Sequence, residues 1–182
     1  MRRNRMMATI AIGVAAAASV VSVATIAVAA PVTAARTGLF ATWHGAQAAA
    51  GFPLLRPTRT YGLVRASEVI VARCEISKKK AAKRNVIGEY GLTPAANLTI
   101  SQNNSNGQCT RTSKGKFLGK YHVDGVTASL TGDCGSKDLP SCLSKKIFLF
   151  LAWRKGGVYY QASSYGESRG VLVSFARGLV RV

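Results

Sequence analysis

The chain has 182 residues, with 25 lysines and arginines, seven aspartates and glutamates, and a formal net charge of +18. Its length suits one domain with one hydrophobic core. The absence of internal repeats and heptads excludes a repeat protein and a coiled coil. So large a charge must lie mostly on the surface, where it attracts phospholipid headgroups, wall polymers, acidic polysaccharide or nucleic acid. The simpler alternative is that the charge serves solubility alone and reflects a coding bias toward Arg and Ala.

The N-terminus is typical of an export signal. Three arginines within residues 2–5 precede segment 8–30, which has 23 residues and no charge, and small residues follow it. This order predicts a signal peptide. An uncleaved membrane anchor is the alternative, because about 20 apolar residues span a bilayer, although the alanine-rich composition favours cleavage. In both cases the arginines stay in the cytoplasm and the rest is exported.

Residues 1–35 are therefore predicted as signal peptide or anchor, and residues 36–182 as a single exported domain. The exported part keeps 22 cations against seven acids, a formal charge of +15. We expect a bacterial, extracytoplasmic protein that is secreted or tethered to the membrane through residues 8–30.

Four cysteines remain after the leader: Cys74, Cys109, Cys134 and Cys142. An even number in an exported chain predicts two disulfides, and four cysteines permit three pairings. Cys134 and Cys142 bracket a loop of Gly, Pro and Ser that they could staple, which leaves Cys74 with Cys109. A zinc site is the alternative, but neither a C-x₂-C motif nor a nearby histidine provides the ligand spacing.

The first elements expected after the leader are a helix and an extended segment. Thr37 can cap a helix that ends at Gly51. Its apolar face would consist of Leu39, Trp43, Ala46 and Ala50. Segment 52–57 contains two prolines and is predicted to be extended. Segment 64–76 alternates in the manner of a strand.

Residues 77–84 form the densest charge run. A solvated loop and an anion-binding patch are both compatible with it. The candidate patch consists of Lys78, Lys79, Lys80, Lys83 and Arg84. No aromatic residue is interleaved, so the run does not indicate stacking on single-stranded nucleic acid.

Two hairpins are predicted further along the chain. Asp124-Gly125 is a strong turn signal between strands at 116–123 and 126–131. Gly156-Gly157 joins the apolar run 147–153, expected to be a strand buried on both faces, to a second strand at 158–162. Two further β-prone runs occupy 86–92 and 96–102. The second hairpin is expected at the centre of an antiparallel sheet.

Ser168 is expected to cap a C-terminal helix. Its apolar side would consist of Val171, Leu172, Phe175 and Leu179, with Arg177 and Arg181 near its C-terminal end. The fold class is therefore α+β, with an antiparallel sheet of about six or seven strands packed against an N-terminal and a C-terminal helix.

A catalytic centre is not predicted. Residues 166–170 fit G-x-S-x-G, the nucleophile motif of the α/β-hydrolases, but those enzymes place an acid and a histidine after the serine, and no Asp, Glu or His follows Ser168. His44 and His122 are expected to be packed or surface residues. The scattered acids form no close pair of the glycosidase type. We therefore predict no catalytic residue, cofactor or metal.

Five short motifs resemble a known family. They occupy 51–57, 98–102, 123–128, 152–160 and 173–179. In this respect the chain is similar to an exported C-terminal domain of unknown function found in some bacterial anti-sigma factors and sporulation-associated membrane proteins. The resemblance implies an α+β domain with an extracytoplasmic binding or sensing role. Only about seven residues precede the apolar segment, so the sigma-binding part of such proteins is not expected here.

The sequence thus predicts a non-enzymatic binding or sensing domain of the cell envelope, whose cationic surface meets an anionic polymer or lipid. The alternatives are a secreted hydrolase using Ser168 or His122, and a secreted cationic effector or nucleic-acid binder.

Overall fold

The computed structural model describes residues 37–65, 68–74, 83–93, 96–105, 109, 115–133 and 147–182. The predicted leader lies outside these ranges. None of the helices found within them has the length and apolarity that a membrane crossing requires. The elements are β1 (Gly38–Phe40), α1 (Trp43–Ala50), β2 (Leu55–Pro57), β3 (Val69–Cys74), β4 (Lys83–Thr93), β5 (Ala96–Asn103), β6 (Lys116–Val123), β7 (Val126–Asp133), β8 (Phe148–Lys155), β9 (Val158–Tyr165), α3 (Arg169–Arg177) and β10 (Leu179–Arg181).

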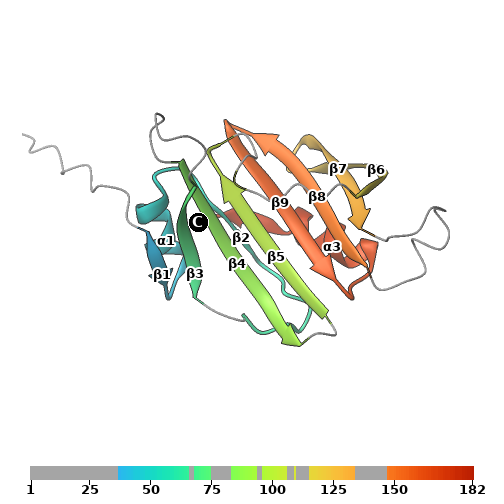
Figure 1. Cartoon of the computed structure of the whole chain (residues 1–182), viewed down its shortest axis with the longest axis horizontal. Coiled ribbons are helices and arrows are strands. Elements are labelled where there is room, and N and C mark those ends of the chain that lie inside the picture. The colour runs from blue at the N-terminus through green and yellow to red at the C-terminus, as the bar shows by residue number, and fades with distance from the viewer. Residues whose placement is uncertain are drawn as a thin grey trace, which may run out of the picture. The chain divides into compact units, whose positions relative to one another are not determined.

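Eight strands form one antiparallel sheet in the order β1-β3-β4-β5-β9-β8-β7-β6, and β10 pairs with β2 in a second sheet of two strands (Figure 1). The α+β class is confirmed, and the β8–β9 hairpin lies in the interior of the large sheet as expected. The prediction of six or seven strands was too low. The extra strands β1, β2 and β10 have three residues each, which is too short for a periodic pattern.

The two helices in the described part of the chain cover the same face of the large sheet. Trp43 of α1 lies directly over Gly88 of β4. Phe175 of α3 contacts the ring of Tyr90 edge-on, with centroids 6.0 Å apart. Because Gly88 and Tyr90 are two residues apart on one strand, they point to the same side. We call this side the helix face and the other side the open face.

The hydrophobic core lies between the helix face and the two helices. In β3, β5 and β8 alternate residues are buried there, including Val69, Val71, Leu98, Ile100, Leu149 and Leu151. The prediction that 147–153 is buried on both faces was wrong. Phe148 is 46% exposed on the open face, which shows that an unbroken apolar run does not guarantee two covered faces.

The N-terminal helix starts later than predicted. Thr42, not Thr37, is the N-cap, and its hydroxyl accepts the Gly45 amide at 3.1 Å. Residues 38–40 form β1 instead, so Leu39 lies on a strand and is 64% exposed. The predicted end at Gly51 is confirmed by its left-handed conformation, with φ of 75°.

The C-terminal helix begins as predicted. The Ser168 hydroxyl accepts the Val171 amide at 3.2 Å, which is the N-cap bond. The helix ends at Arg177, however, and Leu179 and Arg181 belong to β10. α3 packs on β8 and β9, and its residues Leu172 and Phe175 are almost fully buried.

Gln102 joins the two sheets. Its amide accepts the Leu55 N–H at 2.7 Å and donates to the Leu55 carbonyl at 2.6 Å, and the side chain is fully buried. We expect Gln102→Leu to lower the free energy of unfolding by about 2–4 kcal/mol, because it leaves two buried backbone groups of β2 without a partner. Urea unfolding measures this loss. Thr99→Val on the open face is the control, and equal effects of the two variants would contradict this role of Gln102.

Candidate anion-binding surface

The register of the strands collects cations at one end of the large sheet. Asn103 of β5 pairs with Asn85 of β4 on one side and with Tyr159 of β9 on the other, and Tyr159 pairs with Arg154 of β8. The first residues of β4 therefore lie at the same end of the sheet as the last residues of β8. We call this the cationic end, and it contains Arg73, Lys83, Arg84, Arg154 and Lys155. Three strand spacings separate Asn85 from Arg154, a width of about 15 Å.

Four of the five acidic residues in the described part of the chain lie at the opposite end. They are Glu68, Glu89, Asp133 and Glu167. Asp133 pairs with Phe148, which pairs with Tyr165, and Glu89 pairs with Thr99. Arg65 and Lys116 accompany them there, and Arg169 follows Glu167 by two residues. Five of the thirteen described lysines and arginines thus lie at the cationic end, whereas only one of the five described acidic residues, Asp124, lies there.

The predicted anion-binding patch is partly represented at the cationic end. Lys83 and Arg84 are the first residues of β4 and are half-buried, so they do not belong to a solvated loop. Lys78, Lys79 and Lys80 lie outside the described residues. Arg73, which pairs with Arg84, was not predicted to join them. The sequence signal that could have placed Arg73 beside Arg84 was its position in the alternating segment 64–76.

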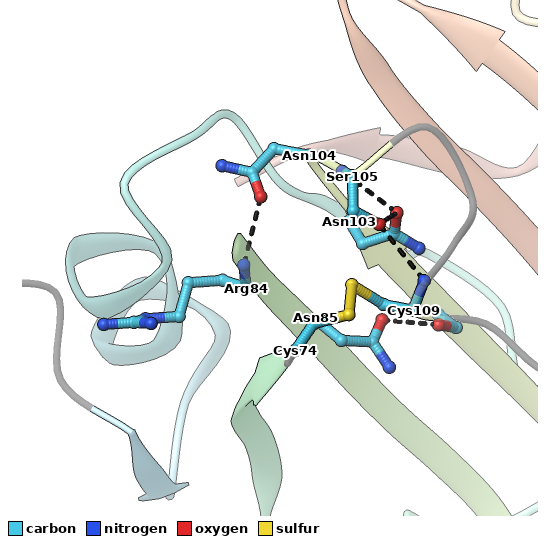
Figure 2. Close-up of a disulfide and its surroundings, with 8 residues drawn as sticks. Cys74, Arg84, Asn85, Asn103, Asn104, Ser105 and Cys109 are labelled. Atoms are coloured by element: carbon cyan, nitrogen blue, oxygen red, sulfur yellow. Dashed lines mark hydrogen bonds between the residues drawn. A yellow bond between two sulfur atoms is a disulfide. The ribbon is translucent and has the colours of Figure 1, made fainter. Parts of the chain in front are cut away.

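A disulfide closes this end of the sheet. Cys74, the last residue of β3, is bonded to Cys109, and their Cα atoms are 5.5 Å apart. Figure 2 shows the surrounding polar groups: Asn103 Oδ1 accepts from the Ser105 hydroxyl, which accepts the Cys109 amide. Arg84 donates its backbone N–H to Asn104 Oδ1 at 3.0 Å. The disulfide attaches the chain after β5 to the end of β3, and the Arg84–Asn104 bond attaches it to the start of β4.

The Cys74–Cys109 pairing confirms the prediction made by elimination, whereas Cys134 and Cys142 lie outside the described residues. A disulfide is compatible with an extracytoplasmic location, since it persists in oxidising compartments.

The two turns at the cationic end are joined by an ion pair. Lys155 Nζ lies 2.5 Å from Asp124 Oδ1, and both side chains are more than a third exposed. Such a surface pair contributes at most about 1 kcal/mol. A cavity of about 60 Å³ beside it reaches Tyr160 and Arg181 and has room only for a few water molecules. Burial and the Asp124 charge raise the pKa of Tyr160, and Arg181 opposes this shift.

A larger hollow lies between α3 and β6. It has a volume of about 280 Å³ and is lined by Tyr121, Arg169, Gly170, Val173, Ser174 and Arg177. Arg177 donates from Nε to the His122 carbonyl at 3.0 Å, which holds its guanidinium group over β6. This site was not predicted, although the regular spacing of Arg169, Val173 and Arg177 places them on one side of a helix.

The open face is polar along its two central strands. β5 contributes Asn97, Thr99, Ser101 and Asn103, and β9 contributes Tyr159, Gln161, Ser163 and Tyr165. Phe148 packs on Tyr165, with ring centroids 4.7 Å apart, at the end of the sheet opposite the cations. No helix among the described residues covers this face. The groups of β5 and β9 on this face are neutral, and Arg154 of β8, whose guanidinium group lies 6.0 Å from the centre of the Tyr159 ring, brings a positive charge to it at the cationic end.

None of the three residues considered for catalysis lies in a catalytic arrangement with another of them. The Ser168 hydroxyl is the N-cap acceptor of α3. His122 contributes its backbone carbonyl to Arg177, and its side chain is exposed, as is that of His44 on α1. The structure therefore does not assemble Ser168 and either histidine into a nucleophile–base pair.

No protein-family model, curated protein or solved structure matches the chain significantly. The resemblance to the exported domain of anti-sigma factors stays a prediction.

Proposed function

We propose that the protein is an exported, non-enzymatic binding domain of the cell envelope, and that the cationic end of its sheet contacts an anionic polymer or lipid surface. The observation that carries this proposal is the gathering of five cations at one end of the sheet, away from four of the five described acidic residues. If the cations served solubility alone, they would be expected to spread evenly over the surface, together with the acidic residues. Five cations gathered at an end that holds only one of the five described acidic residues give this part of the chain a charge asymmetry, which orients it toward an anionic surface.

The fold supports this use of the cationic end. Arg73 and Arg154 are exposed, while the strands that carry them are paired on both sides in the interior of the sheet. The disulfide holds β3 and the chain after β5 together at the same end. The charges are therefore presented on a rigid support, which reduces the entropy lost on binding.

Co-sedimentation with vesicles tests the proposal. We expect the double variant Arg73→Gln/Arg154→Gln to bind vesicles of phosphatidylglycerol and phosphatidylcholine about 30-fold more weakly than the original protein. Each cation near an anionic surface contributes about 1 kcal/mol, and two such losses correspond to this factor. Raising the salt concentration from about 0.05 M to about 0.5 M should also release the original protein from the vesicles.

The control is Arg65→Gln/Lys116→Gln, which removes the same formal charge from the opposite end of the sheet. It should bind within about threefold of the original protein. Equal weakening by the two double variants would show that only net charge matters, and binding that is insensitive to salt would rule out an electrostatic contact.

A further inference from the structure

The hollow between α3 and β6 gathers groups that bind oxyanions. Arg169 and Arg177 both line it and are eight residues apart on α3, which corresponds to about 12 Å along the helix axis. Ser174 and Tyr121, which both carry hydroxyl groups, line it as well. Guanidinium groups bind phosphate oxygens through paired, charge-assisted hydrogen bonds, and hydroxyl groups add single ones.

The charges of the hollow are not neutralised by the described part of the chain. Arg177 uses Nε for the His122 carbonyl, which leaves its two terminal nitrogens directed elsewhere. No described carboxylate lies within ion-pair distance of Arg169 or Arg177. Since both arginines are exposed on the same side of a helix that packs on the core with its other side, the hollow keeps two positive charges at a defined spacing.

The shape of the hollow suits a phosphate group that is attached to a larger molecule. Its volume of about 280 Å³ exceeds what a few water molecules occupy, and its mouth is open to solvent. Val173 and Gly170 form an apolar part of the lining, against which carbon atoms next to the phosphate can lie. The first-turn amides at Arg169 and Gly170 add the positive end of the helix dipole.

We propose that this hollow is a binding site for a single phosphate group, carried either by a phosphodiester polymer or by a phospholipid headgroup. Arg169 and Arg177 bind the phosphate oxygens from two sides, and Ser174 and Tyr121 donate from their hydroxyl groups. This site extends the proposed function, and the identity of its biological ligand rests on that function. The cationic end supplies long-range attraction, and the hollow supplies a specific contact.

Titration of the ¹⁵N-labelled protein with inorganic phosphate at constant ionic strength tests the site. We expect saturable shifts of the amide signals of Gly170, Ser174 and Tyr121. Arg169→Gln/Arg177→Gln should weaken this binding at least about tenfold, because it removes the charged donors. Arg169→Gln alone should weaken it as well, and it keeps the bond between Arg177 and His122.

The variant Arg73→Gln/Arg154→Gln is the matched control and should keep its phosphate affinity within about twofold, since it lies at the cationic end. Shifts that do not saturate, or that are unchanged in Arg169→Gln/Arg177→Gln, would overturn the site. Tyr121→Phe and Ser174→Ala should each weaken binding by about threefold, as expected for one neutral hydrogen bond.

Two competition experiments identify the molecule that carries the phosphate group. Poly(glycerol phosphate) in solution and phosphatidylglycerol vesicles are each tested for competition with inorganic phosphate, and the one that displaces it carries the ligand. If neither displaces it, the hollow is not a site for an envelope phosphate. Vesicle binding that depends on Arg73 and Arg154 without a saturable phosphate site overturns the hollow alone. A saturable phosphate site without vesicle binding overturns the proposed cationic-end contact alone.

Discussion

Replacing Gly88 with alanine is expected to lower the free energy of unfolding by about 2–4 kcal/mol. The added Cβ would overlap Cζ2 of Trp43 and lie 2.8 Å from its Cη2 atom. Trp43 is buried and donates Nε1 to the Tyr90 hydroxyl at 3.0 Å, so moving the ring breaks this bond. Thermal and urea unfolding measure the effect, which corresponds to a fall in Tm of about 5–15 °C.

Gly170→Ala is the control for this substitution. A Cβ at position 170 would meet only the Ser168 hydroxyl oxygen, at 3.7 Å, and the residue is helical. This variant should raise the free energy of unfolding by up to about 1 kcal/mol. Trp43→Phe, which shortens the ring, should recover part of the loss in a Gly88→Ala background. A Gly88→Ala protein as stable as the original would contradict the packing of α1 on β4.

The second large effect is expected from the disulfide. Cys74→Ser/Cys109→Ser removes a cross-link between residues 35 positions apart. The chain-entropy model for a loop of this length predicts a loss of about 3–4 kcal/mol at 25 °C. Urea unfolding followed by tryptophan fluorescence measures the change, without any reducing agent, so that Cys134 and Cys142 keep their own state.

Each single serine variant should lose about as much as the double variant, because either one breaks the cross-link. Adding a reductant to the double variant then reports on Cys134 and Cys142 alone. A double variant within about 1 kcal/mol of the original protein would show that Cys74 and Cys109 are not joined in solution.

The local features of the fold could be predicted from the sequence because each depends on neighbouring residues. Asp124 and Gly125 have φ of 51° and 77°, and Gly156 and Gly157 have φ of 57° and 78°. These residue types tolerate the left-handed conformation that a two-residue hairpin requires. Ser168 capping α3 is a similarly local bond.

The errors concern partners that are distant in the sequence. Thr37 and Thr42 are equally good N-caps by residue type, and the choice between them follows from the pairing of Leu39 with Ile70 across the sheet. Leu179 fits the apolar side of a helix, but it pairs with Pro57 in β10. Neither pairing leaves a signal in the local pattern.

The candidate sites depend on the same distant pairings. The charge run at 77–84 is visible in the sequence, but only the register shows that Lys83 and Arg84 lie at the same end of the sheet as Arg154. Arg169 and Arg177 become a candidate site only because Tyr121 of β6 lies beside α3. A net charge predicts an anionic partner, whereas the fold decides which cations meet it.

The most direct test of the account is to map which amide signals broaden when the ¹⁵N-labelled protein is mixed with phosphatidylglycerol-containing vesicles. The proposed contact predicts selective broadening at the cationic end, around Arg73, Lys83 and Gly156, with little change at Glu89, Thr99 and Tyr165. Broadening concentrated at the acidic end, or spread evenly over the sheet, would contradict it.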